Sequence, residues 1–581
     1  MPRVRFWFAP TRRADLPLLA VCGAFAGLSL ALVPPTLPLG WDEIVYASRF
    51  PPYAPATPFS APRTRGVPLL ISPVAAWSDS TVLLRLWLTL LSTAALYLGF
   101  RPWLRVTVVR RPAVVGVAAG LYGSLWFALF YANSAMPNHY TAMGATAAVG
   151  LFLGARPGRL AHAGIAVGLA LAALMRPNDG AAVALPLLVA ALLVPAWRTR
   201  GRVLAVVGGV LAGLLPWAIE AYLRFGGVRE RLTAASEVQG GLRPLASIEA
   251  QFTVLDGPLL CRPCAADRLG VAAAEWLILL SLLMAAGVRS ARPTASTPDQ
   301  TPRRQTTATA GQFTRRPTTA TPGQVPRPPV PPTPHQVARR QTRDARDQIA
   351  RRQTPGTPNQ TPRQPTPPTP HQNPRHPLWL TLVVAGAVAL PYLLLVPYGA
   401  PRFLLPAHAL LAIPAALGLF TLTAARSKPT PVHTSARSKP TPVHTPARRH
   451  RLALTTALAV LLSAHLAVQL LLVLGNSRIQ AGARGDWGRI AHVLHEHGVR
   501  APCVLDGSAS VIPLAYVSGC SAARESDRRR PDALVLREKR PPPWARDWRR
   551  HPVPDTYAPG WTVLVPPPAP VMRNPATDMR S

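Results

Sequence analysis

The chain has 581 residues, of which 49% are hydrophobic, and 63 Lys and Arg against 25 Asp and Glu give it a formal net charge of +38. A mean hydropathy of +0.17 together with 68 prolines excludes an ordinary soluble domain and predicts many membrane spans. Nucleic acid is not the expected partner, because much of the charge lies between apolar runs, where anionic lipid headgroups attract it.

Apolar runs of roughly 16 to 24 residues, long enough to cross a bilayer, recur along the chain. They cover residues 16–33, 81–99, 113–131, 139–155, 160–175, 180–197, 203–222, 271–288, 378–397, 403–424 and 452–475. The pattern predicts an α-helical polytopic membrane protein with about eleven transmembrane helices.

The basic residues predict how these helices are oriented. Four arginines precede the first run, and no small-residue cleavage site follows it, so we expect a retained helix and a cytoplasmic N-terminus. With that orientation the cytoplasmic segments hold 35 of the 63 Lys and Arg, whereas the outer connections together with Arg85 hold 12. Loops 34–80 and 223–270 and the tail 476–581 are then expected on the outer face of the cytoplasmic membrane.

Two basic inserts divide the membrane region. Residues 290–376 are rich in Pro, Thr, Arg and Gln, and residues 425–451 contain the tandem repeat ARSKPTPVHT. Both predict disordered cytoplasmic segments, and a docking motif for a cytoplasmic partner remains the alternative. The first insert separates a membrane region, 1–289, which we expect to be catalytic, from later transmembrane helices at 377–475, and the second insert lies within that later region.

The tail after the last run predicts a small extracytoplasmic α/β domain. A helical pattern, DWGRIAHVLHEHGV, precedes a strand-like APCVLDG, and two further apolar runs, DALVLR and GWTVLVP, suggest about three strands. We expect this domain to act as a lid or to recognise the acceptor. Cys503 and Cys520 in the tail are candidates for a disulfide, as are Cys261 and Cys264 in an outer loop, because both pairs are expected in an oxidising space.

The polar residues with chemical potential gather at the predicted outer boundary. Asp42 and Glu43 follow the first span in GWDEIVYASRF, and only Glu220 and Glu275 are acidic within or at the ends of spans. Transporters usually bury ionisable groups near the membrane midplane, so this distribution favours an interfacial enzyme. Guanidinium groups at the same level could clamp a phosphate; they are Arg63, Arg65, Arg85, Arg176 and Arg402.

Several motifs in order carry a resemblance to a known family. GWDEIVYASRF, RTRGVPLL, MPNHY, LMRPNDG and APRFLLPAH resemble segments of the GT-C glycosyltransferases, in particular bacterial relatives of protein O-mannosyltransferases and of the aminoarabinose transferase that acts on lipid A. The resemblance covers residues 16–424 without the inserts. It implies a GT-C-like fold and an inverting transfer of sugar from a polyprenyl-phosphate donor to an acceptor hydroxyl, with an acid of the first outer loop as the base.

Site residues follow from the same resemblance. Asp42 would be the general base, and Glu43 would orient the acceptor or hold Asp42 in place. Three arginines would bind the donor phosphate: Arg65, Arg176 and Arg402. Four further residues would line the substrate pocket: Trp41, Tyr46, His139 and Tyr140.

Alternatives remain open at this stage. The acidic pair is an exposed turn if it is not catalytic, and the arginines and aromatic residues are then interfacial anchors. The expected partners are a polyprenyl-phosphate-linked sugar, membrane lipids and an envelope glycan, lipid or protein acceptor. No cofactor or metal site is predicted, although a divalent cation is possible. A transporter or lipid flippase without transferase activity, and a membrane scaffold, are the competing functions.

Overall fold

The computed structural model describes most of the chain outside the two inserts. The described residues are 12–53, 55–109, 111–154, 158–242, 244, 248–261, 270–290, 376–423, 446–508, 511–523 and 530–567. They belong to one structural unit, and every structural statement below concerns them. The expectations for residues 291–375 and 424–445 and for Cys264 lie outside these residues. Residues 446–451, predicted as the end of the second disordered insert, instead belong to a helix.

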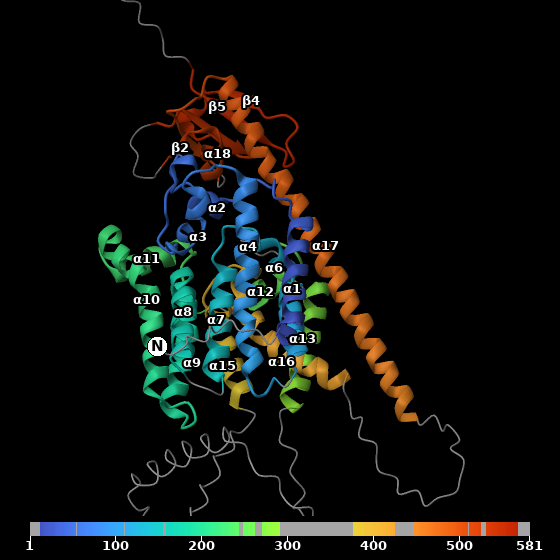
Figure 1. Cartoon of the computed structure of the whole chain (residues 1–581). Helices are drawn as coiled ribbons and strands as arrows, with labels where there is room; N and C mark the ends of the chain where they lie inside the picture. The colour runs from blue at the N-terminus through green and yellow to red at the C-terminus, as the bar shows by residue number, and fades with distance from the viewer. Residues whose placement is uncertain are drawn as a thin grey trace, which may run out of the picture. The chain divides into compact units, whose positions relative to one another are not determined.

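The first part of the chain is a succession of apolar helices joined by short loops and 3₁₀ turns (Figure 1). The elements are α1 (Arg12–Leu32), α2 (Trp41–Ala47), η1 (Pro51–Tyr53), α3 (Gly66–Ala75), α4 (Thr81–Phe100), η2 (Arg101–Arg105), α5 (Pro112–Gly123), α6 (Trp126–Tyr131), α7 (Asn138–Leu153), α8 (Arg159–Met175), α9 (Pro177–Leu193), α10 (Arg200–Phe225), α11 (Val228–Val238), α12 (Ile248–Thr253), η3 (Val254–Asp256) and α13 (Val271–Ser290).

The later helices complete the membrane region and lead into the C-terminal sheet. They are α15 (His376–Leu394), η4 (Pro401–Leu404), α16 (Leu405–Thr423) and α17 (Pro446–Glu496). In the described residues, six helices are long and apolar enough to cross a membrane, and shorter apolar helices accompany them. The chain is a multi-pass membrane protein, mostly helical, with a small C-terminal sheet domain.

Small residues allow the membrane helices to pack closely. Gly287 of α13 and Gly418 of α16 face one another's helix, and a Cβ on either would collide with a backbone carbonyl of the other helix. Gly144 of α7 and Gly168 of α8 make the same kind of approach. Because lipid tails give little hydrophobic drive for helix association, such close backbone contact supplies the packing energy.

The C-terminal domain is built on a five-stranded mixed sheet in the order β2-β1-β3-β5-β4. The strands are β1 (Val504–Gly507), β2 (Ser521–Ala522), β3 (Ala533–Arg537), β4 (Arg549–Pro552) and β5 (Trp561–Val565), with α18 (Val511–Ser518) after β1 and η5 (Pro543–Ala545) before β4. The strands β1, β2 and β3 are parallel, and β5 pairs antiparallel with β3 and β4. The sequence suggested about three strands, and the two further ones, β2 and β4, are short and lack an apolar run.

Two predicted boundaries differ in the structure. The third apolar run, 113–131, is broken into α5 and α6, and the side-chain oxygen of Gln469 accepts a hydrogen bond from the Trp126 N–H that the break exposes. The last span and the helix predicted to follow it form one helix of 51 residues, α17, drawn in orange in Figure 1. A single rigid element therefore runs from the membrane region into the C-terminal domain.

Candidate active site

The predicted acidic pair lies on a short helix, α2, that begins directly after Gly40. The Glu43 side chain folds back and its Oε2 accepts a hydrogen bond from the Gly40 N–H at 2.7 Å, which caps the helix. Neighbouring residues on a helix point about 100° apart. Asp42 and Glu43 therefore project into different surroundings.

Glu43 is buried and fully hydrogen-bonded. Arg85 donates to both carboxylate oxygens at 3.2 Å, the Ala135 N–H donates to Oε1 at 2.9 Å, and Arg484 of α17 donates to Oε2 at 3.2 Å. Burial alone would raise the pKa of Glu43, but Arg85, Arg484 and the backbone donors at Gly40 and Ala135 outweigh it, so the pKa lies below its ordinary value. A carboxylate held by so many donors is suited to fixing α2, not to exchanging protons.

Asp42 lies in a more open and more positive environment. Its side chain is 33% exposed, Arg63 contacts Oδ1 at 2.5 Å, and Arg402 contacts Oδ2 at 3.3 Å. Burial acts to raise the pKa of Asp42, but the charges of Arg63, Arg402 and Arg176 together hold it below its ordinary value. Asp42 is therefore an ionised, accessible carboxylate beside three guanidinium groups.

The arginines predicted near the donor phosphate separate into two groups. Arg402, in η4, bridges Asp42 and the Tyr131 hydroxyl, to which it donates at 3.1 Å. Arg176, between α8 and α9, pairs with Asp179 at 2.9 Å and donates to the Tyr392 hydroxyl. Asp42, Arg63, Arg176 and Arg402 are called the Asp42 cluster below.

Arg65 is directed elsewhere, and Arg63 takes the place beside Asp42. The Arg65 Nε donates to Glu220 of α10 at 3.1 Å, and its guanidinium carbon lies 4.3 Å from the centre of the Phe59 ring. Arg65 is the residue that precedes α3, so the chain turns there and the side chains of residues 63 and 65 diverge. Arg63, and not Arg65, therefore contacts Asp42, and the donor-phosphate role of Arg65 stays a prediction.

Of the predicted pocket residues, the two in α2 lie at the site. Trp41 is 44% exposed at the start of the helix. Tyr46 is buried, and the Arg63 guanidinium carbon lies 5.9 Å from its ring centre. Burial raises the pKa of Tyr46 to about 12, so it is a neutral hydroxyl at physiological pH.

The two pocket residues predicted in α7 are buried in helix packing. Both ring nitrogens of His139 are occupied at 2.9 Å, one by the Tyr122 hydroxyl and the other by the Ser92 carbonyl. His139 therefore does not line an open pocket. Tyr140 is also buried, and its hydroxyl has no hydrogen-bond partner within the described part of the chain.

Arg85 and Arg484 are the contacts that sequence reasoning did not place. The sequence gave Arg85 the same interfacial level as the other arginines, but its burial against Glu43 depends on tertiary packing. Arg484 lies 441 residues from Glu43, beyond the last predicted span. A Cβ on Gly40 would lie 2.8 Å from its guanidinium, so this contact also explains the glycine before α2.

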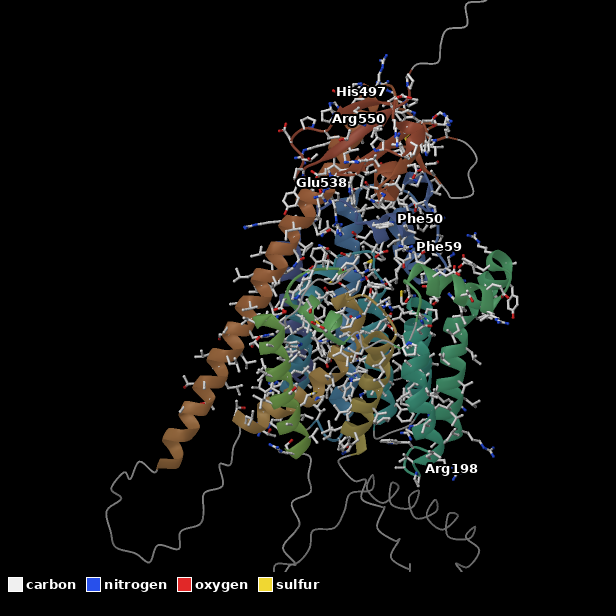
Figure 2. All side chains as sticks on the ribbon, turned by 180° about the vertical axis from the view of Figure 1, so that it is seen from behind. Phe50, Phe59, Arg198, His497, Glu538 and Arg550 are labelled. Carbon is white, nitrogen blue, oxygen red and sulfur yellow. A yellow bond between two sulfur atoms is a disulfide. The ribbon has the colours of Figure 1, made fainter. Side chains whose placement is uncertain are left out.

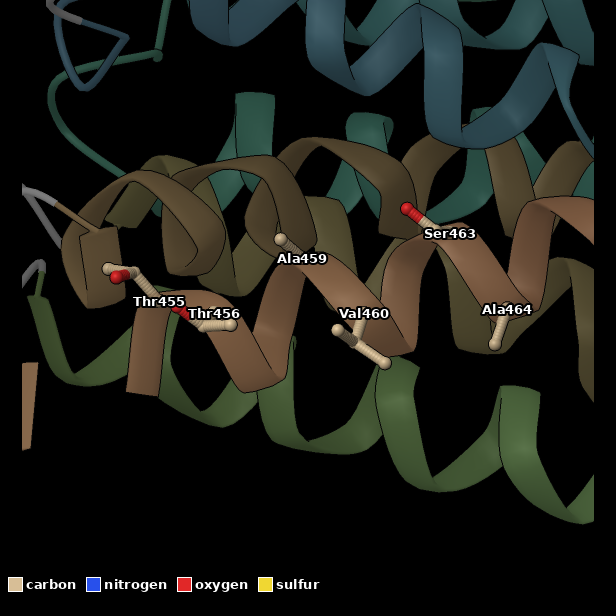
Figure 3. Close-up of a pocket in the computed structure, with 6 residues that line it drawn as sticks. All are labelled: Thr455, Thr456, Ala459, Val460, Ser463 and Ala464. Carbon is tan, nitrogen blue, oxygen red and sulfur yellow. The ribbon is translucent and has the colours of Figure 1, made fainter. Parts of the chain in front are cut away.

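The remaining predicted features lie away from Asp42. Cys503 and Cys520 form a disulfide in the C-terminal domain, and Cys261 is also disulfide-bonded. Across the described ranges, no three His, Cys, Asp or Glu side chains gather closely enough to hold a metal ion. A cavity of about 590 Å³ beside α17 has no titratable lining residue and takes no part in the site (Figure 3). Its lining residues are Thr455, Thr456, Ala459, Val460, Ser463 and Ala464.

Two solved structures share the overall fold of this chain. ArnT from Cupriavidus metallidurans bound to undecaprenyl phosphate superposes with a TM-score of 0.52 at 11% identity, over 96% of this chain and 99% of that one. ArnT from the same organism in the apo state gives a TM-score of 0.51 at 14% identity, over 95% and 98%. This chain has a GT-C-like fold. No protein-family model matches its sequence, and no curated protein does.

Proposed function

We propose that the protein transfers a sugar from a polyprenyl-phosphate donor to an acceptor hydroxyl at the outer face of the cytoplasmic membrane. The observation that carries the proposal is the Asp42 cluster, in which one accessible carboxylate contacts Arg63 and Arg402 and lies in the field of Arg176. A base for a hydroxyl and fixed positive charge for a leaving phosphate are the two requirements of this chemistry.

In the proposed reaction the acceptor oxygen attacks the anomeric carbon of the donor. The carbon–oxygen bond to phosphate breaks with inversion, its electron pair leaves with the polyprenyl phosphate, and the hydroxyl proton passes to Asp42. Each carboxylate oxygen has two lone pairs, so Asp42 can accept this proton while its arginine contacts hold it in place. A low pKa keeps it ionised before the reaction.

The arginines would stabilise the leaving phosphate. Three of them, Arg63, Arg176 and Arg402, face only two carboxylates, Asp42 and Asp179. This excess positive charge suits an anionic donor. In a low-dielectric site it acts without reorganisation during the reaction. The proposal requires no metal ion, and activity that survives a divalent-cation chelator is the expected result.

Comparing strains with and without the gene tests the proposal. We expect the strain lacking the gene to accumulate a polyprenyl-phosphate-linked sugar and to lose one envelope glycan modification. Purified protein should transfer sugar from such a lipid to an acceptor in liposomes. Translocation of the lipid without any transfer would instead support a flippase and overturn the enzyme.

A further inference from the structure

A second group of arginines surrounds Glu220 and Phe59, near the end of α10. Arg65 and Arg231 take opposite oxygens of the Glu220 carboxylate, and the Arg224 Nε lies 3.7 Å from one of them. Arg65 also lies over the ring of Phe59, which is labelled in Figure 2. One negative charge, on Glu220, therefore faces three positive charges.

Arg49 adds a fourth positive charge to this group. Its guanidinium carbon lies 5.7 Å from the centre of the Phe59 ring, the ring that Arg65 also covers. Its one side-chain hydrogen bond, to the Ser48 hydroxyl, is long at 3.4 Å, and its buried Nε has no partner among the described residues. Burial and repulsion from Arg65, Arg224 and Arg63 lower the pKa of Arg49. The group is electrostatically incomplete without an anion.

Apolar side chains beside these arginines indicate the kind of anion. Tyr222 and Leu223 of α10 are 71% and 78% exposed directly before Arg224. Leu232 of α11 is 48% exposed. An apolar surface next to unneutralised guanidinium groups matches a molecule with a phosphate at one end and a hydrocarbon chain at the other.

We propose that Arg49, Arg65 and Arg224 form a second phosphate site, which binds the headgroup phosphate of a membrane lipid. The site is separate from the Asp42 cluster because the segment between Phe59 and α3 divides its arginines: Arg63 turns to Asp42 and Arg65 to Glu220. This inference concerns binding alone and does not depend on the proposed transfer reaction.

Two of the three arginines can be removed without leaving Glu220 unpaired. Arg49 forms no ion pair in the described part of the chain, and Arg224 is a distant and exposed partner of Glu220, which keeps Arg65 and Arg231. Arg49→Gln and Arg224→Gln should therefore fold. Arg198→Gln is the matched control, because Arg198 is an exposed arginine that precedes α10 at its opposite end (Figure 2).

The test measures binding of dioctanoyl phosphatidic acid to the purified full-length protein in neutral detergent. All variants carry Arg402→Gln, which removes one arginine of the Asp42 cluster and so weakens phosphate binding there. We expect Arg49→Gln and Arg224→Gln each to weaken binding by about tenfold or more, as loss of a hydrogen bond to a charged group predicts, and Arg198→Gln to leave it unchanged. Dioctanoyl phosphatidylglycerol and inorganic phosphate form the comparison arms.

Each possible binding result either supports the proposed site or overturns it. Equal lipid binding by the Arg49→Gln, Arg224→Gln and control proteins overturns the site. Inorganic phosphate that binds as tightly as the lipids overturns the lipid assignment, because the apolar surface would then contribute nothing. Preference for phosphatidic acid over phosphatidylglycerol identifies a phosphate monoester as the ligand, whereas equal binding identifies any phospholipid headgroup, and both support the site.

Discussion

The two sides of α2 show how neighbouring carboxylates acquire different roles. On one side Glu43 is closed in by Arg85, Arg484 and backbone donors and contributes to holding the helix. On the other side Asp42 keeps a third of its side chain exposed and faces arginines that are themselves partly exposed. Both pKa values are lowered, so charge alone does not distinguish the two residues. The two residues differ in their exposure to solvent and in how many hydrogen bonds their carboxylate oxygens already accept.

Removing the Asp42 charge gives the strongest test of this difference. Asp42→Asn should reduce sugar transfer by about 10²- to 10⁴-fold, the usual range for loss of a general base, while the protein stays inserted and folded. The measurement is the initial rate of transfer in liposomes at saturating donor. Asp79→Asn, which changes an exposed aspartate before α4 in the same way, serves as the control. Unchanged transfer by Asp42→Asn would remove the base assignment.

Glu43→Gln should act on stability first. It leaves the fully buried Arg85 without its carboxylate, and breaking a buried pair in this way costs about 3–5 kcal/mol. A lower midpoint of thermal inactivation in detergent is the expected measurement. Glu230→Gln, an exposed position in α11, is the matched control. A Glu43→Gln protein as stable as this control, but inactive, would contradict the structural role of Glu43.

The arginines near Asp42 should be distinguishable from Arg65. Arg402→Gln is expected to lower transfer by about tenfold or more, because it removes a fixed charge from the proposed leaving phosphate. Arg65→Gln should mainly reduce stability through its lost pairing with Glu220. Rates measured per folded protein separate the two effects. The opposite ranking would return Arg65 to the donor site.

Much of this arrangement could be predicted from the sequence, and the exceptions have physical causes. Apolar runs of bilayer length predict the membrane helices. The acidic pair can be placed just after the first of them, because it follows that run in the sequence. The continuity of α17 does not, because Gly475, Asn476 and Ser477 after its apolar run have low helix propensity. Tertiary packing overrides that preference.

At the site, the sequence identifies which segments take part but not where their side chains point. Arg63 and Arg65 are two residues apart, just before the chain enters α3 at Gly66, and they pair with different carboxylates, Asp42 and Glu220. Arg484 reaches Glu43 from a helix near the other end of the chain, and no local motif marks it. Such contacts depend on the fold as a whole.

The pH dependence of transfer sharpens the description of Asp42. A base must be ionised, so activity should be full above the pKa of Asp42 and lost as the pH falls through it. Because the arginines lower this pKa, the acid limb should lie below the range of an ordinary aspartate. Arg63→Gln removes one of these charges and should move the acid limb to higher pH. Arg229→Gln in α11 is the control, and an equal shift in both would assign the limb to another group.

Deleting residues 295–370 should have the smallest effect of these changes. The helices on either side pack onto other membrane helices, α13 onto α16 and α15 onto α9 and α16, so their positions are set without the insert. We therefore expect the deletion protein to transfer sugar at nearly the wild-type rate in liposomes. Loss of transfer with normal insertion would mean that the division between a catalytic and a supporting side of α2 omits a third contribution, made by the deleted segment.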